Sequence, residues 1–324
     1  MFKKYLGAAA IACSIGLMAA PANAAFVLEN ITLNFNGVDG LDDTPLPGSY
    51  TYSPVDALGF VATVHAVIDD ANGNFLPNDG ETGEVSGFGS IDSINNGGGD
   101  APTGSGIDLR GNTVQIGGLD GFEFTFEFQE VPIQFTNDTG SFTHTGPDGD
   151  SVGVLNMYID NLTSAGDSPG SSQCFTEVSG AGCTDGVLVA SWVIMPGEGG
   201  LFAFNIQDGT DNATFMSTFL LDGVWFDEFG NDLGCNNADA DPANHCDQIL
   251  GLADSNFDAD PDGTGSFGNF DPTSFDCGAT AVDFCASEDG SFVIARIPEP
   301  TTLGLLGMGV AGLGFLSLRR RKQD

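Results

Sequence analysis

Residues 122–129 read Phe-Glu-Phe-Thr-Phe-Glu-Phe-Gln, an alternation of phenylalanine with polar residues over eight positions. In a β-strand, successive side chains point to opposite faces, so the four phenylalanines would share one face and the polar residues the other. An α-helix would spread the same rings around its circumference. The stretch therefore predicts a half-buried β-strand.

Other apolar or alternating runs carry the same signal, and clusters of Gly, Asp, Asn and Ser that favour turns separate them. The predicted strands are Ile31–Phe35, Phe60–Ile68, Phe122–Gln129, Val152–Ile159, Val187–Ile194, Leu201–Ile206, Thr214–Leu221 and Ser291–Ile297. Trp192 and Trp225 lie in or beside such runs, which favours core packing. The pattern predicts an all-β domain over residues 25–297, arranged as a β-sandwich or jelly roll.

The charge of this predicted domain is strongly one-sided. Residues 25–297 contain two arginines, Arg110 and Arg296, no lysine and 43 of the 45 acidic residues, which gives a formal charge of −41. Such a surface repels nucleic acid, so we expect no nucleic-acid partner. It also repels itself, so the folded state needs salt or bound divalent cations.

Six cysteines lie within residues 25–297, and an even number in an exported chain favours disulfides. Proximity predicts the local pairs Cys174–Cys183, Cys235–Cys246 and Cys277–Cys285. Zinc ligation is the alternative, but no Cys-x-x-Cys spacing supports it. Residues 231–290 carry four of the six and are rich in Asp, Asn and Gly, which suggests a long insertion between the last two strands.

The best metal candidate lies in this interval, where oxygen-bearing side chains recur at every second position before Gly263. The predicted ligands are Asp254, Asn256, Asp258, Asp260 and Asp262. Alternating oxygen ligands followed by glycine are typical of calcium loops, so calcium is the expected ion. The alternative is an acidic, disordered loop. The run Asp69–Asn74 has similar chemistry but is interpreted as a turn.

Signatures of catalysis are scarce. None of the three histidines, His65, His144 and His245, stands in a His-Glu-x-x-His frame. His65 falls in a predicted strand, and the other two fall in predicted loops. The chain is therefore expected not to be an enzyme. A glycoside hydrolase that uses a carboxylate pair is the alternative.

Residues 1–24 have the features of a signal peptide. Lys3 and Lys4 precede an apolar stretch, and Ala22-Asn23-Ala24 offers the small residues that signal peptidase recognises. A lipoprotein with Cys13 as the lipid-bearing residue is the alternative. The segment predicts export.

The last 27 residues combine three features. Pro298-Glu299-Pro300 resists helix formation, and residues 301–318 are free of charge and long enough for a short transmembrane helix. A basic cluster follows directly and consists of Arg319, Arg320, Arg321 and Lys322. Such a cluster is expected to stay on the cytoplasmic side of the membrane. An ordinary tail anchor is the alternative.

In this order, residues 298–322 resemble the PEP-CTERM sorting segment of Gram-negative bacteria. Ile297 stands where the family more often has valine. The resemblance implies processing by an exosortase after passage through the inner membrane, and a final location at the cell surface or in the extracellular matrix. It also implies a link to exopolysaccharide and biofilm. Acidic faces bridged by divalent cations would bind anionic polysaccharide, whereas a secreted carbohydrate-active enzyme with the same tag is the alternative.

Overall fold

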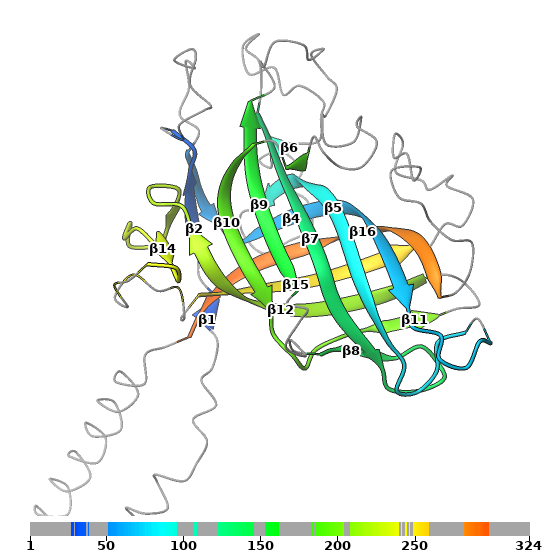
Figure 1. Ribbon diagram of the computed structural model, residues 1–324. Coiled ribbons are helices and arrows are strands. Elements are labelled where there is room, and N and C mark those ends of the chain that lie inside the picture. Colours follow the sequence, from blue (N-terminus) through cyan, green and yellow to red (C-terminus); the bar gives the residue numbers. More distant parts are fainter. Residues whose placement is uncertain are drawn as a thin grey trace, which may run out of the picture. The chain divides into compact units, whose positions relative to one another are not determined.

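Eight long strands of the computed structural model form one antiparallel sheet that closes on itself like a cylinder (Figure 1). Each strand pairs with the next long strand along the chain, and the last, β16, pairs with the first, β4. The eight are β4 (Ala57–Ile68), β5 (Thr82–Asn95), β7 (Phe122–Phe135), β9 (Val154–Asn161), β10 (Val187–Ile194), β12 (Asp208–Leu220), β15 (Ile249–Asp258) and β16 (Asp283–Arg296). We call this assembly the closed sheet.

The structure describes residues 27–28, 30–36, 38, 51–74, 76–95, 107–108, 122–145, 153–161, 183–184, 186–203, 208–239, 241, 244, 246, 249–258 and 282–297. The shorter strands are β1 (Val27–Leu28), β2 (Ile31–Asn34), β3 (Thr51–Val55), β6 (Ile107–Asp108), β8 (Phe142–His144), β11 (Leu201–Ala203), β13 (Trp225–Phe226) and β14 (Cys235–Asn236). Within these ranges, no helix is long and apolar enough to cross a membrane. The predicted signal peptide, sorting motif, transmembrane helix 301–318 and basic cluster lie outside the described residues.

The prediction of an all-β domain is confirmed, and the arrangement of its strands is now defined. The long strands form a single closed sheet rather than two stacked sheets. Alternating sequences such as residues 122–129 require one buried face, and both arrangements provide it. The pairing of β16 with β4, which lie far apart in the sequence, distinguishes the closed sheet from two stacked sheets.

Most predicted strands coincide with observed ones, and Val187–Ile194 matches β10 residue for residue. Two long strands, β5 and β15, were not predicted. The interval 231–290 is therefore not a single insertion, because it contains β14, all of β15 and the first half of β16. β15 is itself a strand of the closed sheet and pairs with β12 on one side and β16 on the other.

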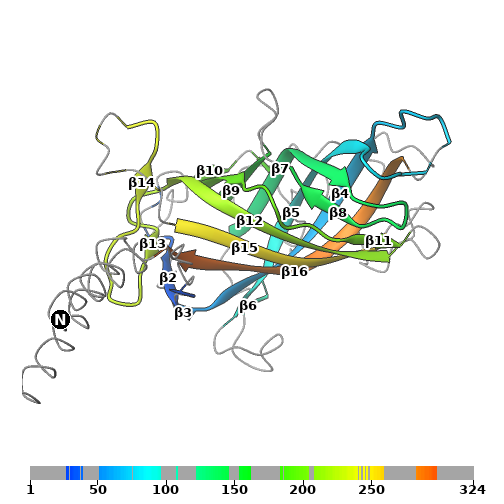
Figure 2. The ribbon, with the colours of Figure 1, turned by 90° about the horizontal axis from the view of Figure 1, so that it is seen from below.

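A small three-stranded sheet, in the order β13-β2-β3, lies at one end of the closed sheet (Figure 2). Trp225 of β13 is fully buried, and its ring centroid lies 6.4 Å from that of Phe124 in β7. Phe35 packs edge-on against the same Phe124 at 5.6 Å. The indole N–H of Trp225 donates to the carbonyl of Val189 at 2.8 Å. This end of the interior is therefore filled by aromatic packing. The prediction that both tryptophans lie in the core is confirmed, because Trp192 is also fully buried.

One predicted disulfide is present among the described cysteines, between Cys235 and Cys246. Cys183 and Cys285 are also disulfide-bonded. Their predicted partners, Cys174 and Cys277, lie outside the described residues, so those two pairings stay predictions. The Cys235–Cys246 bridge joins β14 to the segment that leads into β15.

Glycines in the closed sheet leave room for phenylalanine rings inside it. A Cβ atom at Gly89 of β5 would collide with the ring of Phe126 on β7. A Cβ atom at Gly251 of β15 would collide with the ring of Phe292 on β16 in the same way. These rings therefore lie across the backbone of a neighbouring strand, which positions them around the interior.

A candidate ligand-binding cavity inside the closed sheet

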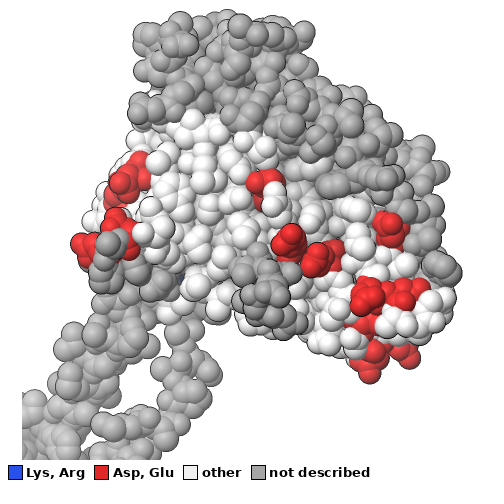
Figure 3. Space-filling view, viewed as in Figure 1, with Lys and Arg blue, Asp and Glu red and all other residues white. Residues whose placement is uncertain are grey.

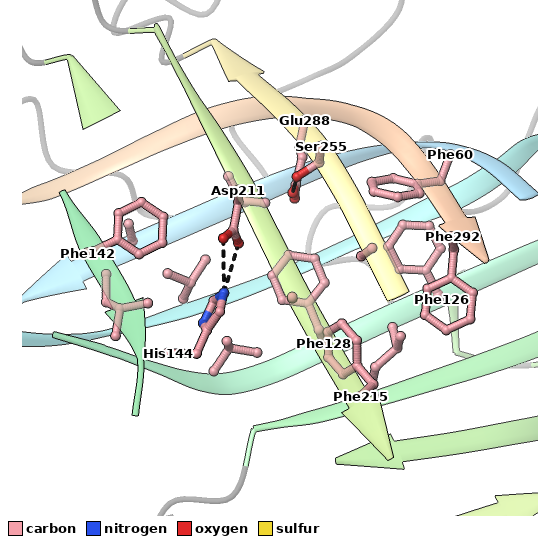
Figure 4. A pocket seen from close by; sticks show the side chains of 18 of the residues that line it. Phe60, Phe126, Phe128, Phe142, His144, Asp211, Phe215, Ser255, Glu288 and Phe292 are labelled. Atoms are coloured by element: carbon pink, nitrogen blue, oxygen red, sulfur yellow. Dashed lines mark hydrogen bonds and ion pairs between the residues drawn. The ribbon is translucent and has the colours of Figure 1, made fainter. Parts of the chain in front are cut away.

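The interior of the closed sheet contains a cavity of about 110 Å³. Its lining is overwhelmingly apolar, with phenylalanines from four of the long strands (Figure 4). These rings belong to Phe60, Phe126, Phe128, Phe135, Phe215 and Phe292. Apolar cavities of this order take up benzene-sized molecules in other proteins. The space is therefore large enough for a small apolar ligand.

A histidine and an aspartate form a buried pair in this lining. His144 lies on β8, and its side chain is 2% exposed. Its Nε2 lies 3.0 Å from Oδ1 and 3.2 Å from Oδ2 of Asp211, which projects inward from β12 (Figure 4). The other ring nitrogen, Nδ1, is buried and has no hydrogen-bond partner among the described residues. Buried polar atoms are nearly always paired, so an unpaired ring nitrogen is unusual in such a lining.

A second polar pair lines the same cavity. The hydroxyl of Ser255 on β15 donates to the carboxyl of Glu288 on β16. The pKa of Glu288 is raised to about 7, above all by burial. The nearby Asp211 and Asp289 carboxylates contribute to the rise, while the Ser255 hydrogen bond and His144 act in the opposite direction. Glu288 therefore exchanges its proton near neutral pH, in an otherwise apolar space.

Strand alternation explains why these polar groups meet. On β12, residues 211, 213 and 215 all line the cavity, as do residues 253 and 255 on β15. Asp211 and Ser255 thus occupy positions of the inward row that apolar residues hold elsewhere. The sequence placed His144 in a loop, whereas β8 pairs with β7 and turns its side chain inward. His65 is half-buried in β4, as expected, and contacts Asp283 at 2.8 Å.

The predicted calcium ligands are only partly described, and they do not form a loop where they are. Asp254 and Asn256 lie on β15 with exposed side chains, on the face opposite Ser255. Alternate residues of a strand are roughly 7 Å apart, so an extended strand does not place successive ligands around one ion as a curved loop does. Asp258 ends the strand and its side chain is not described, while Asp260 and Asp262 lie outside the described residues. Among the described side chains, no group of three His, Cys, Asp or Glu is placed to hold a metal.

The turn between β4 and β5 gathers oxygen-bearing side chains around a buried carboxyl group. Glu81 is 8% exposed, and its two oxygens accept from Asn72 Nδ2 at 3.2 Å and from the backbone N–H of Asn78 at 2.8 Å. Asp70 Oδ1 accepts from the backbone N–H groups of Gly73 and Asn74. The turn predicted at Asp69–Asn74 is confirmed, and it continues to Glu81.

The spacing of this turn was missed by the sequence reasoning. Asp70, Asn72, Asn74, the carbonyl of Leu76, Asn78 and Glu81 stand at positions 1, 3, 5, 7, 9 and 12 of a calcium loop. Position 6, where such loops carry glycine, is Phe75. The available signal was that the segment from Asp70 to Glu81 is twelve residues long, the length of a calcium loop.

On the face drawn in Figure 3, acidic side chains gather where the turn Asp70–Glu81 lies.

One of the two arginines in residues 25–297, Arg296, lies 3.8 Å from the buried carboxylate of Asp227. Hydrogen bonds from Asn231 and Phe229, together with Arg296, lower the pKa of Asp227 despite its burial, which acts in the opposite direction. The positive charge of Arg296 is thus used within the fold.

Comparison with known proteins bears on the segment that follows the closed sheet. Residues 296–322 match the family model described as the PEP-CTERM protein-sorting motif. No curated protein and no solved structure matches the chain. The matched range contains Pro298-Glu299-Pro300, the uncharged segment and the basic cluster in the order that the resemblance required. The chain therefore carries a PEP-CTERM protein-sorting domain, and it is an exported protein that an exosortase processes for the cell surface.

Proposed function

We propose that this surface-sorted protein binds a small apolar molecule inside its closed sheet. The observation that carries the proposal is the cavity of about 110 Å³ with its lining of phenylalanine and aliphatic side chains. Moving apolar surface from water into such a space is favourable by about 25 cal/mol per Å². The sorting domain supplies the location, because it brings the cavity outside the cell.

A cavity-filling variant tests this function. Ala213 is buried on β12 and lines the cavity, so leucine at this position would occupy part of it. An apolar fluorescent probe titrated into the exported protein should bind the wild type and should bind Ala213→Leu at least about tenfold more weakly. Ala238→Leu, on the exposed part of the chain, is the matched control and should bind like the wild type. Equal binding by all three would refute an internal site.

An enzyme remains an alternative proposal. Asp211 and Glu288 provide two carboxyl groups in one cavity, as a glycoside hydrolase requires. The surrounding lining is apolar, and sugar hydroxyls buried there would lose their hydrogen bonds to water. This argument favours binding over hydrolysis.

We also propose that calcium stabilises the domain, with the turn Asp70–Glu81 as the better-supported position. Two carboxylates, three side-chain amides and one carbonyl have the spacing of a calcium loop. The amides of Asn72 and Asn78 direct their nitrogens at Glu81, and rotating each amide by 180° would present its oxygen instead. The earlier candidate, Asp254–Asp262, has two of its ligands on a strand. Gram-negative matrix attachment, through cations that bridge the −41 charge to anionic exopolysaccharide, remains a proposal of the same kind.

Calcium should raise the melting temperature of the exported protein more than sodium at equal ionic strength does, because an ion that binds only the folded state stabilises it. Glu81→Gln should remove most of the calcium-specific increase, whereas Asp254→Asn should retain it. Loss of the increase in Asp254→Asn alone would locate the ion at the earlier candidate. Equal increases from calcium and sodium would exclude both positions.

A further inference from the structure

The polar groups in the cavity are almost all hydrogen-bond acceptors. A carboxylate can only accept, so beside an ionised Asp211 the proton of a neutral His144 ring lies on the Nε2 that faces it. Nδ1 of His144 is then a bare acceptor, 2% exposed as a side chain and without a partner among the described residues. The residue His144 is part of the cavity lining (Figure 4).

When Glu288 is ionised, the second pair contributes no free donor. A serine hydroxyl has one hydrogen, and Ser255 directs it to Glu288. Glu288 adds a carboxyl group to the same wall, and Asp211 is close enough to influence it electrostatically. A molecule that fits these groups must therefore donate hydrogen bonds, and positive charge on it would be favoured.

From this arrangement we infer that the ligand is a small amphiphile with a primary ammonium head, held by His144, Asp211 and Glu288, and an apolar tail among the phenylalanines. The inference rests on the proposed function and names its ligand class. An ammonium group supplies three donors, whereas a carboxylate head would be repelled by the ionised carboxyl groups of the wall. The domain's formal charge of −41 also concentrates cations at its surface.

The ionisation of Glu288 gives the inference a second readout. With a pKa of about 7, part of the Glu288 population is protonated at pH 6.5. The groups that face it are Asp211 from β12, His144 from β8 and Ser255 from β15, with Asp289 beside it on β16. A bound ammonium group favours the ionised carboxylate, so binding should release protons at this pH.

Isothermal titration of the exported protein with hexylamine, hexanol and hexanoate tests the head group, because the three share one tail. Hexylammonium should bind at least about tenfold more tightly than hexanol, the gain expected from charge-assisted hydrogen bonds, and hexanoate should bind most weakly. Titration at pH 6.5 in buffers of different ionisation enthalpy should reveal proton release with hexylammonium alone. Hexanoate binding as tightly as hexylammonium would overturn the inference.

Variants separate the head group from the cavity. Glu288→Gln should lower the ratio of hexylammonium to hexanol affinity by about tenfold and abolish proton release. Glu228→Gln, at an exposed position, is the matched control and should leave that ratio unchanged. If all three probes bind the wild type equally, the cavity binds apolar tails. The proposed function then stands, and only the ammonium inference fails. If none of them binds, the proposed function fails with it.

Discussion

At the scale of single residues, the unusual feature is a pair of carboxyl groups in the wall of an apolar cavity. Asp211 is paired with His144, and Glu288 with Ser255, so each carboxyl group has one close partner. Taking a carboxylate out of water disfavours its charged form, which is why the pKa of Glu288 rises. The folded protein therefore holds Glu288 ionised at a cost in stability above neutral pH.

This cost predicts a pH-dependent effect of Glu288→Gln. The carboxyl group has a pKa of 4.5 when unfolded and about 7 when folded, so the stability linked to its proton is present below pH 4.5 and lost as pH rises through 7. Glutamine keeps the shape and carries no charge. The variant should match the wild type near pH 4 and exceed it at pH 8 by up to about 3 kcal/mol in the free energy of unfolding.

Urea unfolding at several pH values measures this difference. Glu228→Gln should show no such trend, because Glu228 is exposed. A constant difference between wild type and Glu288→Gln from pH 4 to pH 8 would mean that Glu288 is not buried in the way described.

Residue-scale reasoning from the sequence succeeded where the signal was local. Cys235 and Cys246 are eleven positions apart and are bonded. His144 could not be assigned, because its burial depends on β11, β12 and β15 reaching the same cavity. Glu81 was missed because Asp70 stands eleven residues earlier, and the run Asp69–Asn74 ends before Glu81.

At the scale of elements, the two missed strands share one cause. β5 carries Gly83, Gly87 and Gly89, and the last two leave room for the rings of Phe128 and Phe126 on β7. β15 carries Gly251 under Phe292. The apolar surface at these points belongs to the neighbouring strand, so the strand's own sequence does not alternate. Strands such as β10 supply their own apolar side chains and were predicted correctly.

The closed sheet predicts different losses of stability for two substitutions on one strand. Gly251→Ala places a methyl group against the ring of Phe292, which is held by Trp192 at 5.3 Å, so it should cost about 1–3 kcal/mol. Ala253→Val adds two carbon atoms on the same face of β15, but it points into the cavity and should cost less than 1 kcal/mol. Chemical unfolding of both variants compares them.

The reverse order of stability would contradict this packing. If Ala253→Val destabilised the protein more than Gly251→Ala, the space beside Ala253 would be filled. The cavity would then end before β15.

At the scale of the whole molecule, the sequence determined the fold class but not the closure. Alternation along residues 122–129 predicts a half-buried strand and does not say which strand lies on either side. Closure depends on β16 pairing with β4, and on a register that runs from Leu58 with Phe292 to Val67 with Asp283. No local pattern encodes that pairing. The sorting domain was predictable because its three parts are contiguous.

Sorting should depend on the Pro-Glu-Pro motif. Replacing Pro298, Glu299 and Pro300 by alanine should leave the protein unprocessed in the inner membrane, because the exosortase loses its recognition sequence. Cell fractionation with mass determination would detect the retained, larger form. Ile297→Val, which restores the residue more usual in the family, should be sorted normally. Normal release of the triple-alanine variant would show that another feature directs sorting.

The central claim is that the closed sheet encloses a cavity able to hold a small apolar molecule. A crystal structure of the exported protein under xenon pressure tests it most directly, because apolar cavities take up xenon without needing any polar contact. We predict eight strands in one closed sheet, with xenon bound among Phe126, Phe215 and Phe292. Two separate stacked sheets, or a closed sheet whose interior is filled by its own side chains and binds no xenon, would contradict the account.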